Sequence, residues 1–186
     1  MVKIFFDFET TGCYWNFDAP VQIAAICEKD GEIIDSFNEL CRTTVTISPQ
    51  ATKVHGITRE MIKDKRGEAV VLRDFVRWIR SHNCDMLIGY NSKAFDLPML
   101  EIRCAKFGIP GVSDIKHMDG YYNCVKLAKD RNYYNLKTIL GRKWNLGAVA
   151  EVLGFNKDGA HDALTDVKML RNIWNKVEHD YPDLIS

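Results

Sequence analysis

Apolar and polar side chains alternate with a period of two over the first ten residues, which predicts a β-strand. One face of this strand carries four apolar side chains, Val2, Ile4, Phe6 and Phe8. The opposite face carries Phe5 followed by two acids, Asp7 and Glu9. The strand therefore has one face suited to a hydrophobic core and one face on which two carboxylates lie close together.

The pattern downstream predicts two more strands and then helices. Residues 20–41 are typical of two strands around a turn at Asp30 and Gly31, which makes an antiparallel meander with the first strand. From Ser48 the pattern becomes helical, with a Ser-Pro start and a break at Gly56. A strong helix follows, with apolar residues at helical spacing: Leu72, Phe75, Val76 and Ile79.

Strands and helices alternate in the second half of the chain. Residues 85–92 read as a buried strand, and the next helix starts near residue 96 and stops at Gly108. Residues 112–119 are compatible with a fifth strand, and the remainder is helical in pattern. A meander followed by alternating strands and helices predicts an α/β fold, with a mixed sheet covered by helices.

The composition is that of an ordinary globular protein. Of the 186 residues, 46% are apolar and 27% are charged, which excludes both disorder and long membrane spans. The length suits one hydrophobic core, so we expect a single domain over residues 1–186. Met1 does not open a signal-peptide pattern, so we expect a cytoplasmic protein. The six cysteines are scattered singly, which predicts free thiols.

Charge is uneven in one segment only. The net charge is zero, so the chain as a whole does not indicate a polyanionic partner. From Lys126 to Lys143, however, six cations stand against one acid, interleaved with Tyr133 and Tyr134. Such a segment suits a nucleic-acid strand, with phosphates on the cations and bases stacked on the rings. A solvated helical face with its aromatic residues in the core explains the pattern equally well.

Asp7 and Glu9 raise the question of a metal site. Their side chains leave the same face about 6.6 Å apart along the strand, at about 3.3 Å per residue. Two carboxylates on a buried face repel each other and resist ionisation unless a cation lies between them. Magnesium and manganese ions prefer such oxygen ligands. The alternative is that this face is exposed to solvent at the edge of the sheet.

A third acid falls within the apolar stripe of the last predicted helix. That stripe consists of Ala163, Val167, Leu170, Trp174 and Val177. Asp166 lies three residues after its first member and four before its third, so a helix packed through the stripe points an acid at the sheet. A metal ion held by Asp7 and Glu9 would give that acid a partner.

His161 lies next to this helix, in the loop before an N-cap at Asp162. From a loop it can reach the same site and act as a general base, because an ordinary histidine pKa of about 6.5 suits proton transfer near neutral pH. An exposed loop histidine without a role is the alternative. Asp96, ahead of the helix containing Pro98, is ambiguous because it can serve as an N-cap or as a further carboxylate of the site.

Three motifs, DFETTG, NSKAFD and HDALTD, together resemble those of the DnaQ-like 3′–5′ exonucleases in their histidine-bearing (DEDDh) form. They occur in the family's order between Asp7 and Asp166. The segment VHGIT, residues 54–58, is similar to one found in bacterial proofreading exonucleases, such as the exonuclease domain of DNA polymerase III. The tyrosine-bearing branch would have a tyrosine four residues before Asp166, where this chain has Asp162.

The resemblance implies an RNase H-like fold with a mixed five-stranded sheet. It implies two divalent ions, Mg²⁺ or Mn²⁺, held by the four acids Asp7, Glu9, Asp96 and Asp166. In such sites the ions generate a hydroxide nucleophile and stabilise the transition state, and His161 would take the proton from the attacking water. The implied activity is removal of nucleoside 5′-monophosphates from the 3′ end of single-stranded or frayed DNA.

The same resemblance implies the residues that contact the substrate. Thr10, Thr11 and Gly12 would let the loop after the first strand approach the terminal nucleotide, and His55 and Phe95 would line its pocket. The aromatic residues Tyr14, Trp15 and Phe17 are candidates for a wedge that stacks on the terminal bases. Core packing is an alternative explanation for at least one of these aromatic residues.

Other functions stay open at this point. An exoribonuclease would use the same five catalytic residues, because the choice depends on contacts to a 2′-hydroxyl that the motifs do not reveal. A non-catalytic nucleic-acid-binding relative is a second alternative, although the presence of all five residues argues against it. An unrelated hydrolase or cation-binding protein would leave the four acids far apart. A polymerase or a repair protein is a candidate partner, and the oligomeric state is open.

Overall fold

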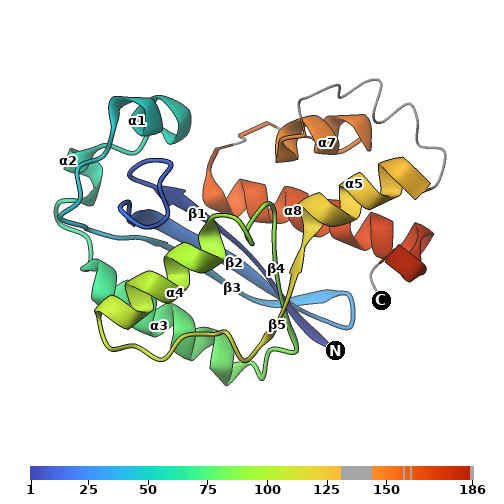
Figure 1. The fold of residues 1–186 in the computed structure, drawn as a ribbon, viewed down its shortest axis with the longest axis horizontal. Coiled ribbons are helices and arrows are strands. Elements are labelled where there is room, and N and C mark those ends of the chain that lie inside the picture. Colours follow the sequence, from blue (N-terminus) through green and yellow to red (C-terminus); the bar gives the residue numbers. More distant parts are fainter. Residues whose placement is uncertain (131–143, 157, 160, 185–186) are drawn as a thin grey trace.

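A central five-stranded sheet organises the computed structural model, which describes residues 1–130, 144–156, 158–159 and 161–184 (Figure 1). The strand order across the sheet is β3-β2-β1-β4-β5. The strands are β1 (Val2–Thr10), β2 (Pro20–Lys29), β3 (Glu32–Leu40), β4 (Met86–Gly89) and β5 (Lys116–Asp119). β1, β2 and β3 are antiparallel neighbours, whereas β4 runs parallel to β1 and β5 parallel to β4. The predicted mixed sheet is therefore confirmed.

Tight turns that require glycine determine where two of these strands end. Asp30 and Gly31 both have positive φ, 52° and 89°, as a tight two-residue hairpin requires. β4 is shorter than the strand predicted for residues 85–92 and ends at Gly89. A Cβ atom on Gly89 would lie 2.3 Å from the Cβ of Ser92, so the chain turns closely back on itself there. β5 covers only the last four residues of the segment predicted at residues 112–119.

Helices cover both faces of the sheet (Figure 1). The helices are α1 (Pro49–His55), α2 (Arg59–Ile62), α3 (Glu68–Ser81), α4 (Asp96–Lys106), α5 (Gly120–Asp130), α7 (Leu146–Val152) and α8 (Ala163–Asp180), followed by a 3₁₀ turn, Pro182–Leu184. α3 and α4 pack on one face, and α8 packs on the other together with α5 and α7. Ser48 caps α1 and Gly56 ends it with φ 74°, as predicted.

β1 contributes to both hydrophobic layers, as its alternating pattern predicts. Ile4, Phe6 and Phe8 pack in the core beneath α3 and α4. Phe5 faces the other way, and its ring meets that of Trp174 on α8 edge to face, with 6.4 Å between the centroids. The face that carries Asp7 and Glu9 is therefore the one that α8 covers, and the alternative of a solvent-exposed edge face is wrong.

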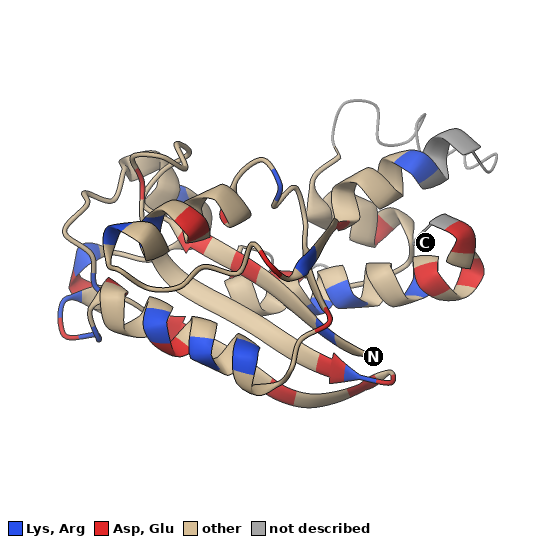
Figure 2. Ribbon diagram, turned by 60° about the horizontal axis from the view of Figure 1, so that its bottom comes forward, with Lys and Arg blue, Asp and Glu red and all other residues tan. Residues whose placement is uncertain are grey.

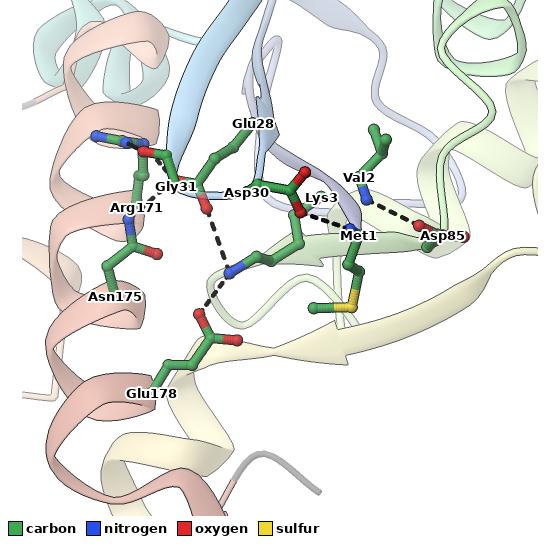
Figure 3. A network of polar contacts seen from close by, with 10 residues as sticks. All are labelled: Met1, Val2, Lys3, Glu28, Asp30, Gly31, Asp85, Arg171, Asn175 and Glu178. Carbon is green, nitrogen blue, oxygen red and sulfur yellow. Dashed lines mark hydrogen bonds and ion pairs between the residues drawn. The ribbon is translucent and has the colours of Figure 1, made fainter.

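A buried polar network joins α8 to the sheet near the start of β1 (Figure 3). Glu28 on β2 is fully buried and accepts hydrogen bonds from Arg171 Nε at 2.6 Å and Asn175 Nδ2 at 2.9 Å, both on α8. Lys3 on β1 completes the network, with its ammonium 3.2 Å from Glu28 and in contact with Glu178. Because each buried charge has a partner, the network fixes this end of α8 without leaving an isolated ion.

Acidic and basic residues are interspersed over the described chain, in line with its zero net charge (Figure 2). Residues 131–143 of the basic segment between Lys126 and Lys143 lie outside the described residues. All six cysteines are free thiols, as predicted. None of the described helices combines the length and the apolar character needed to cross a lipid bilayer.

Candidate active site

Three carboxylates meet at the carboxyl end of β1, below the first turn of α8. One oxygen from each of Asp7, Glu9 and Asp166 lies within 4.8 Å of the other two. β1 supplies the first two from one face, and α8 supplies the third because its apolar stripe is buried against the sheet. Asp162 caps α8 by accepting a hydrogen bond from the Thr165 N–H at 3.1 Å, as predicted.

Asp96 approaches this cluster from α4, although it does not act as the helix cap. The N-cap is Phe95, with φ −137° and ψ −72°, and Asp96 is the first helical residue. The N-cap interpretation of Asp96 is therefore wrong. Burial dominates the environment of its carboxylate, and the nearby Phe8 N–H of β1 offsets part of the resulting rise in its pKa. The charge of Asp96 raises the pKa of both Asp7 and Glu9.

Burial and mutual repulsion raise the pKa values of these acids and so favour their protonated forms. Burial, reinforced by the charges of Asp96 and Asp166, raises the pKa of Asp7 well above its ordinary value. Burial and the same two neighbours raise the pKa of Glu9 to about 8, and burial raises that of Asp96 to about 7. Burial also raises the pKa of Asp166. A hard divalent cation would relieve this repulsion, so the donor set fits Mg²⁺ or Mn²⁺.

These raised pKa values predict how stability depends on pH. Without divalent cations, we expect the melting temperature to fall by about 3–5 °C between about pH 6.5 and pH 8. In this window the unfolded chain has ionised Glu9 and Asp96, whereas the folded protein keeps a proton on Asp96 up to about pH 7 and on Glu9 up to about pH 8, so that stability decreases as the pH rises. Burial lowers the pKa of His55 and of His117, so these two histidines make stability rise with pH. They do so only below about pH 6.5, the ordinary pKa of a histidine in the unfolded chain.

Thermal unfolding in EDTA between pH 6.5 and 8 checks this prediction, with the variant Glu9→Gln as the control. The variant should show a flatter dependence, because it removes one of the groups that titrate in the window. A melting temperature that stays constant or rises over the same range would contradict it.

His161 lies in the loop immediately before the N-cap of α8, as predicted, with an exposed side chain. Its backbone is in the left-handed region, with φ 73°, which is uncommon for any residue other than glycine. Its N–H donates to Asp166 Oδ1 at 3.3 Å. This hydrogen bond and the charge of the imidazole offset part of the rise in the pKa of Asp166, which places the histidine beside the acid cluster.

A cavity of about 520 Å³ opens beside the carboxylates, between β1, α1 and the loop that precedes α4. Its lining includes Glu9, Thr10, Gly12, His55 and Phe95, five of the residues that the motifs single out. Sequence reasoning missed the other lining side chains, among them Cys13, Ser48, Gln50 and Asn91. Capping signals predicted α1 itself, but they carry no information about which of its faces lines a cavity.

His55 is held in one tautomer at the wall of this cavity. The Ile57 N–H donates to His55 Nδ1 at 3.0 Å, so Nε2 carries the hydrogen and donates to the Thr10 carbonyl, also at 3.0 Å. Burial lowers the pKa of His55 and thereby favours this neutral form. The histidine thus fixes the end of β1 against α1.

The loop after β1 is organised by Asp18. Its carboxylate accepts from the Thr11 hydroxyl at 2.7 Å and from the Tyr14 N–H at 2.8 Å. A Cβ atom on Gly12 would lie 2.6 Å from an Asp18 oxygen, so only glycine allows this approach. Thr11 is fully buried within the loop and does not line the cavity, unlike Thr10.

The aromatic side chains of this loop face solvent. Tyr14 is 65% exposed, Trp15 40% and Phe17 74%, so the alternative of core packing is wrong for all three. They follow Gly12 and Cys13 in the chain, two residues that line the cavity. Exposed apolar rings beside a cavity commonly mark a binding surface.

Asp119, at the end of β5, also contributes to the site and was missed by sequence reasoning. Its buried carboxylate accepts the N–H groups of Asn91, Lys93 and Tyr121 at 2.8–3.0 Å. It thereby fixes the loop that carries Phe95 and Asp96. The bond to Tyr121 is local, but the bonds to Asn91 and Lys93 form only when the folded sheet places β5 beside β4, so no local signal indicates this role.

Comparisons with known proteins find similarity over most of the chain. A family model described as "Exonuclease" matches residues 4–174. Curated relatives are DNA polymerases III of the PolC type: that of Thermotoga petrophila is 27% identical over 168 residues, and that of Bacillus subtilis is 34% identical over 103 residues. The matches cover 90% and 55% of this chain, but only 11% and 7% of those polymerases.

Solved structures of E. coli exonuclease I share the fold. Its zinc-bound form in a complex with single-stranded DNA superposes with a TM-score of 0.80 at 21% identity, over 99% of this chain and 42% of that one. Its complex with a 5cy-dT13 oligonucleotide gives a TM-score of 0.84 at 20% identity, over 98% and 42%. The chain thus spans less than half of exonuclease I and about a tenth of the first polymerase relative. The predicted RNase H-like fold is confirmed.

Proposed function

Because this chain belongs to the exonuclease family whose model spans residues 4–174, we propose that it is a metal-dependent 3′–5′ exonuclease. Its substrate in this proposal is the 3′ end of single-stranded or frayed DNA, and its products are nucleoside 5′-monophosphates. The observation that carries the proposal is the convergence of Asp7, Glu9 and Asp166 within 4.8 Å, beside a cavity of about 520 Å³. Such a cluster at the edge of an accessible cavity suits hydrolysis of a phosphodiester.

The four acids are the proposed ligands of two divalent ions, Mg²⁺ or Mn²⁺. When bound, such ions activate water and stabilise the charge that develops on a phosphate. Asp7 and Glu9 would hold them from the sheet, Asp166 from α8 and Asp96 from α4. The raised pKa values of these acids support the assignment, because binding a cation would offset the repulsion that raises them.

His161 is the proposed general base. It lies on an exposed loop, and its N–H donates to Asp166 at 3.3 Å, so the histidine lies beside the acid cluster. In this proposal its imidazole would reach a water molecule bound at the cluster. The imidazole would take a proton from that water as the water attacks the phosphorus. The 3′ oxygen of the penultimate nucleotide would then leave, and the terminal nucleotide would keep its 5′-phosphate.

The terminal nucleotide is proposed to occupy the cavity beside Thr10, Gly12, His55 and Phe95. The Phe95 ring offers a surface for stacking, whereas His55 and Thr10 hold each other at the wall. Thr11 would act indirectly, through its hydrogen bond to Asp18. Bases next to the 3′ end would then stack on the exposed rings of Tyr14 and Trp15.

Removing both exposed rings with Tyr14→Ala and Trp15→Ala is expected to raise KM for a DNA oligonucleotide by about tenfold or more, because stacking contributes about 1–3 kcal/mol per base. The kcat value should change little, since neither ring contacts the acid cluster. Steady-state kinetics on single-stranded DNA check this, with Ile33→Ala as the control. Ile33 is 50% exposed at the hairpin turn, at the far end of the sheet. An unchanged KM would contradict the assignment.

Degradation of matched single-stranded DNA, double-stranded DNA and RNA, each labelled at the 5′ end, tests the proposed function. The proposal predicts a ladder that shortens from the 3′ end, fastest on single-stranded DNA. Faster shortening of RNA would favour the exoribonuclease alternative, which uses the same acids. Binding of DNA without any shortening would favour the non-catalytic alternative.

Residues 1–186 are proposed to form one exonuclease domain. The PolC-type relatives suggest a polymerase as its partner, and a repair protein is the alternative. We propose that it acts in the cytoplasm, as expected for an enzyme that hydrolyses nucleic acid.

A further inference from the structure

One buried amide side chain fastens the start of α8 to β2. Gln22 is 6% exposed and lies opposite Glu9 in the β1–β2 pairing, so both side chains leave the sheet on the same face. Its Nε2 donates to Asp162 Oδ1 and to Asn38 Oδ1, each at 3.0 Å. Its Oε1 accepts a longer hydrogen bond from the Ala163 N–H, at 3.4 Å. Both donor hydrogens of the amide and one lone pair of its oxygen are thus directed at the start of α8 or at β3.

Asp162 divides its two oxygens between the sheet and its own helix. Oδ1 accepts from Gln22, whereas Oδ2 accepts from the Thr165 N–H at 3.1 Å and the Thr165 hydroxyl at 2.9 Å. The residue before it is His161, and Asp166 follows one turn later. The contact therefore lies between the two groups that α8 and its preceding loop bring to the acid cluster.

We propose that Gln22 and Asp162 are a positioning pair for hydrolysis, an inference that rests on the proposed exonuclease function. Their hydrogen bond fixes the first turn of α8 next to Glu9, and thereby sets where His161 and Asp166 lie relative to the acids of β1. Neither residue contacts the reacting atoms in this proposal. As long as position 162 is a carboxylate, an amide suits position 22, because its NH₂ donates to that carboxylate while its oxygen accepts from a helix N–H.

The rest of α8 does not depend on this contact. About six residues along β2 from Gln22, or roughly 20 Å at 3.3 Å per residue, Glu28 holds Arg171 and Asn175 of the same helix (Figure 3). The apolar stripe of α8 is buried between these two points. The helix therefore stays docked without Gln22, and the expected loss is one of local geometry at its first turn.

The isosteric variant Gln22→Glu tests the pair, because it places a carboxylate against the carboxylate of Asp162. We expect kcat to fall by about 10²-fold, since a displacement of about 1 Å at a catalytic group costs this much. KM for the oligonucleotide should stay within about twofold, because the pair is not part of the proposed substrate cavity.

The double variant Gln22→Glu with Asp162→Asn should restore kcat to within about fivefold of the wild type, as expected for two residues whose effects are coupled. The new amide at position 162 can donate to the new carboxylate at position 22 while its oxygen still caps Thr165. The exposed Asn38 can turn its own amide to donate to that carboxylate as well. The double variant also keeps the net charge of the wild type.

A matched pair of truncations separates positioning from stability. Gln22→Ala and Asn175→Ala each delete one amide between α8 and β2, at opposite ends of the helix. Both should lower the melting temperature, but only Gln22→Ala should lower kcat, by about tenfold or more. If Gln22→Glu fails to fold, the comparison of the two alanine variants still tests the proposal.

The positioning pair would be overturned if Gln22→Glu kept the wild-type kcat or changed only KM. It would also be overturned if the double variant were no more active than Gln22→Glu. Equal kcat values for the two alanine variants would overturn it as well. Failure of the proposed function is a different result, because the wild type itself would then release no nucleotides.

Discussion

Replacing Asp7 with asparagine is expected to abolish hydrolysis and, at the same time, to stabilise the metal-free protein. Activity should fall by at least about 10³-fold, because a bound metal ion contributes several kcal/mol to the transition state and each 1.4 kcal/mol is a factor of about ten. Stability should rise because asparagine keeps the shape of the side chain but cannot ionise, which removes the cost of holding a carboxyl group where burial and the charges of Asp96 and Asp166 raise its pKa. At pH 8 in EDTA, we expect a melting temperature about 3 °C or more above that of the wild type.

Opposite changes in activity and stability distinguish a metal ligand from an ordinary buried residue, whose replacement lowers both. Asp85→Asn is the matched control, because Asp85 also contacts β1, accepting the Val2 N–H at 2.8 Å at the opposite end of the strand. This variant should keep its activity. An active Asp7→Asn variant, or one less stable than the wild type in EDTA, would contradict the assignment of Asp7.

Replacing His161 with glycine is expected to lower kcat by about 10²–10⁴-fold, the usual contribution of a general base. Glycine is the informative substitution because His161 has φ 73°, a conformation that glycine adopts without strain. The loop and the N-cap at Asp162 should therefore keep their geometry, and KM should change little.

Added imidazole provides the discriminating measurement for this variant. The His161 side chain is exposed, so its removal leaves a space open to solvent in which free imidazole can accept the proton. We expect imidazole to recover part of the lost kcat in His161→Gly and to leave the wild type unchanged. His179→Ala, at the exposed end of α8, is the control and should retain full activity. A loss of activity that imidazole does not recover would argue against a proton-transfer role.

Much of this site could be predicted because its signals are local. The alternation in β1 separated Phe6 from Asp7, and the apolar stripe of α8 placed Asp166 on the buried side of its helix. Both inferences need only the period of a strand or of a helix. The same holds for the N-cap at Asp162, whose carboxylate bonds to the residue three positions later.

The remainder depends on contacts between distant segments. Asp96 matches the local pattern of an N-cap, yet its charge raises the pKa of Asp7, which lies 89 residues earlier in the chain. Gln22 interrupts an apolar run without any sign that its amide reaches Asp162, because the pairing exists only when α8 lies on β2. Asp119 is hidden for the same reason. A single sequence records which side chains can make such bonds, but not which partners the fold supplies.

The identity of the released product is the most direct test of the proposed metal-dependent 3′–5′ exonuclease activity. Single-stranded DNA labelled at its 5′ end would be incubated with the protein in Mg²⁺ or Mn²⁺, and in EDTA, and the small products would be separated by chromatography. We expect nucleoside 5′-monophosphates and a ladder shortening from the 3′ end with either ion, and no reaction in EDTA or with Asp7→Asn. Release of 3′-monophosphates, initial loss of the 5′ label, or equal activity in EDTA would contradict it.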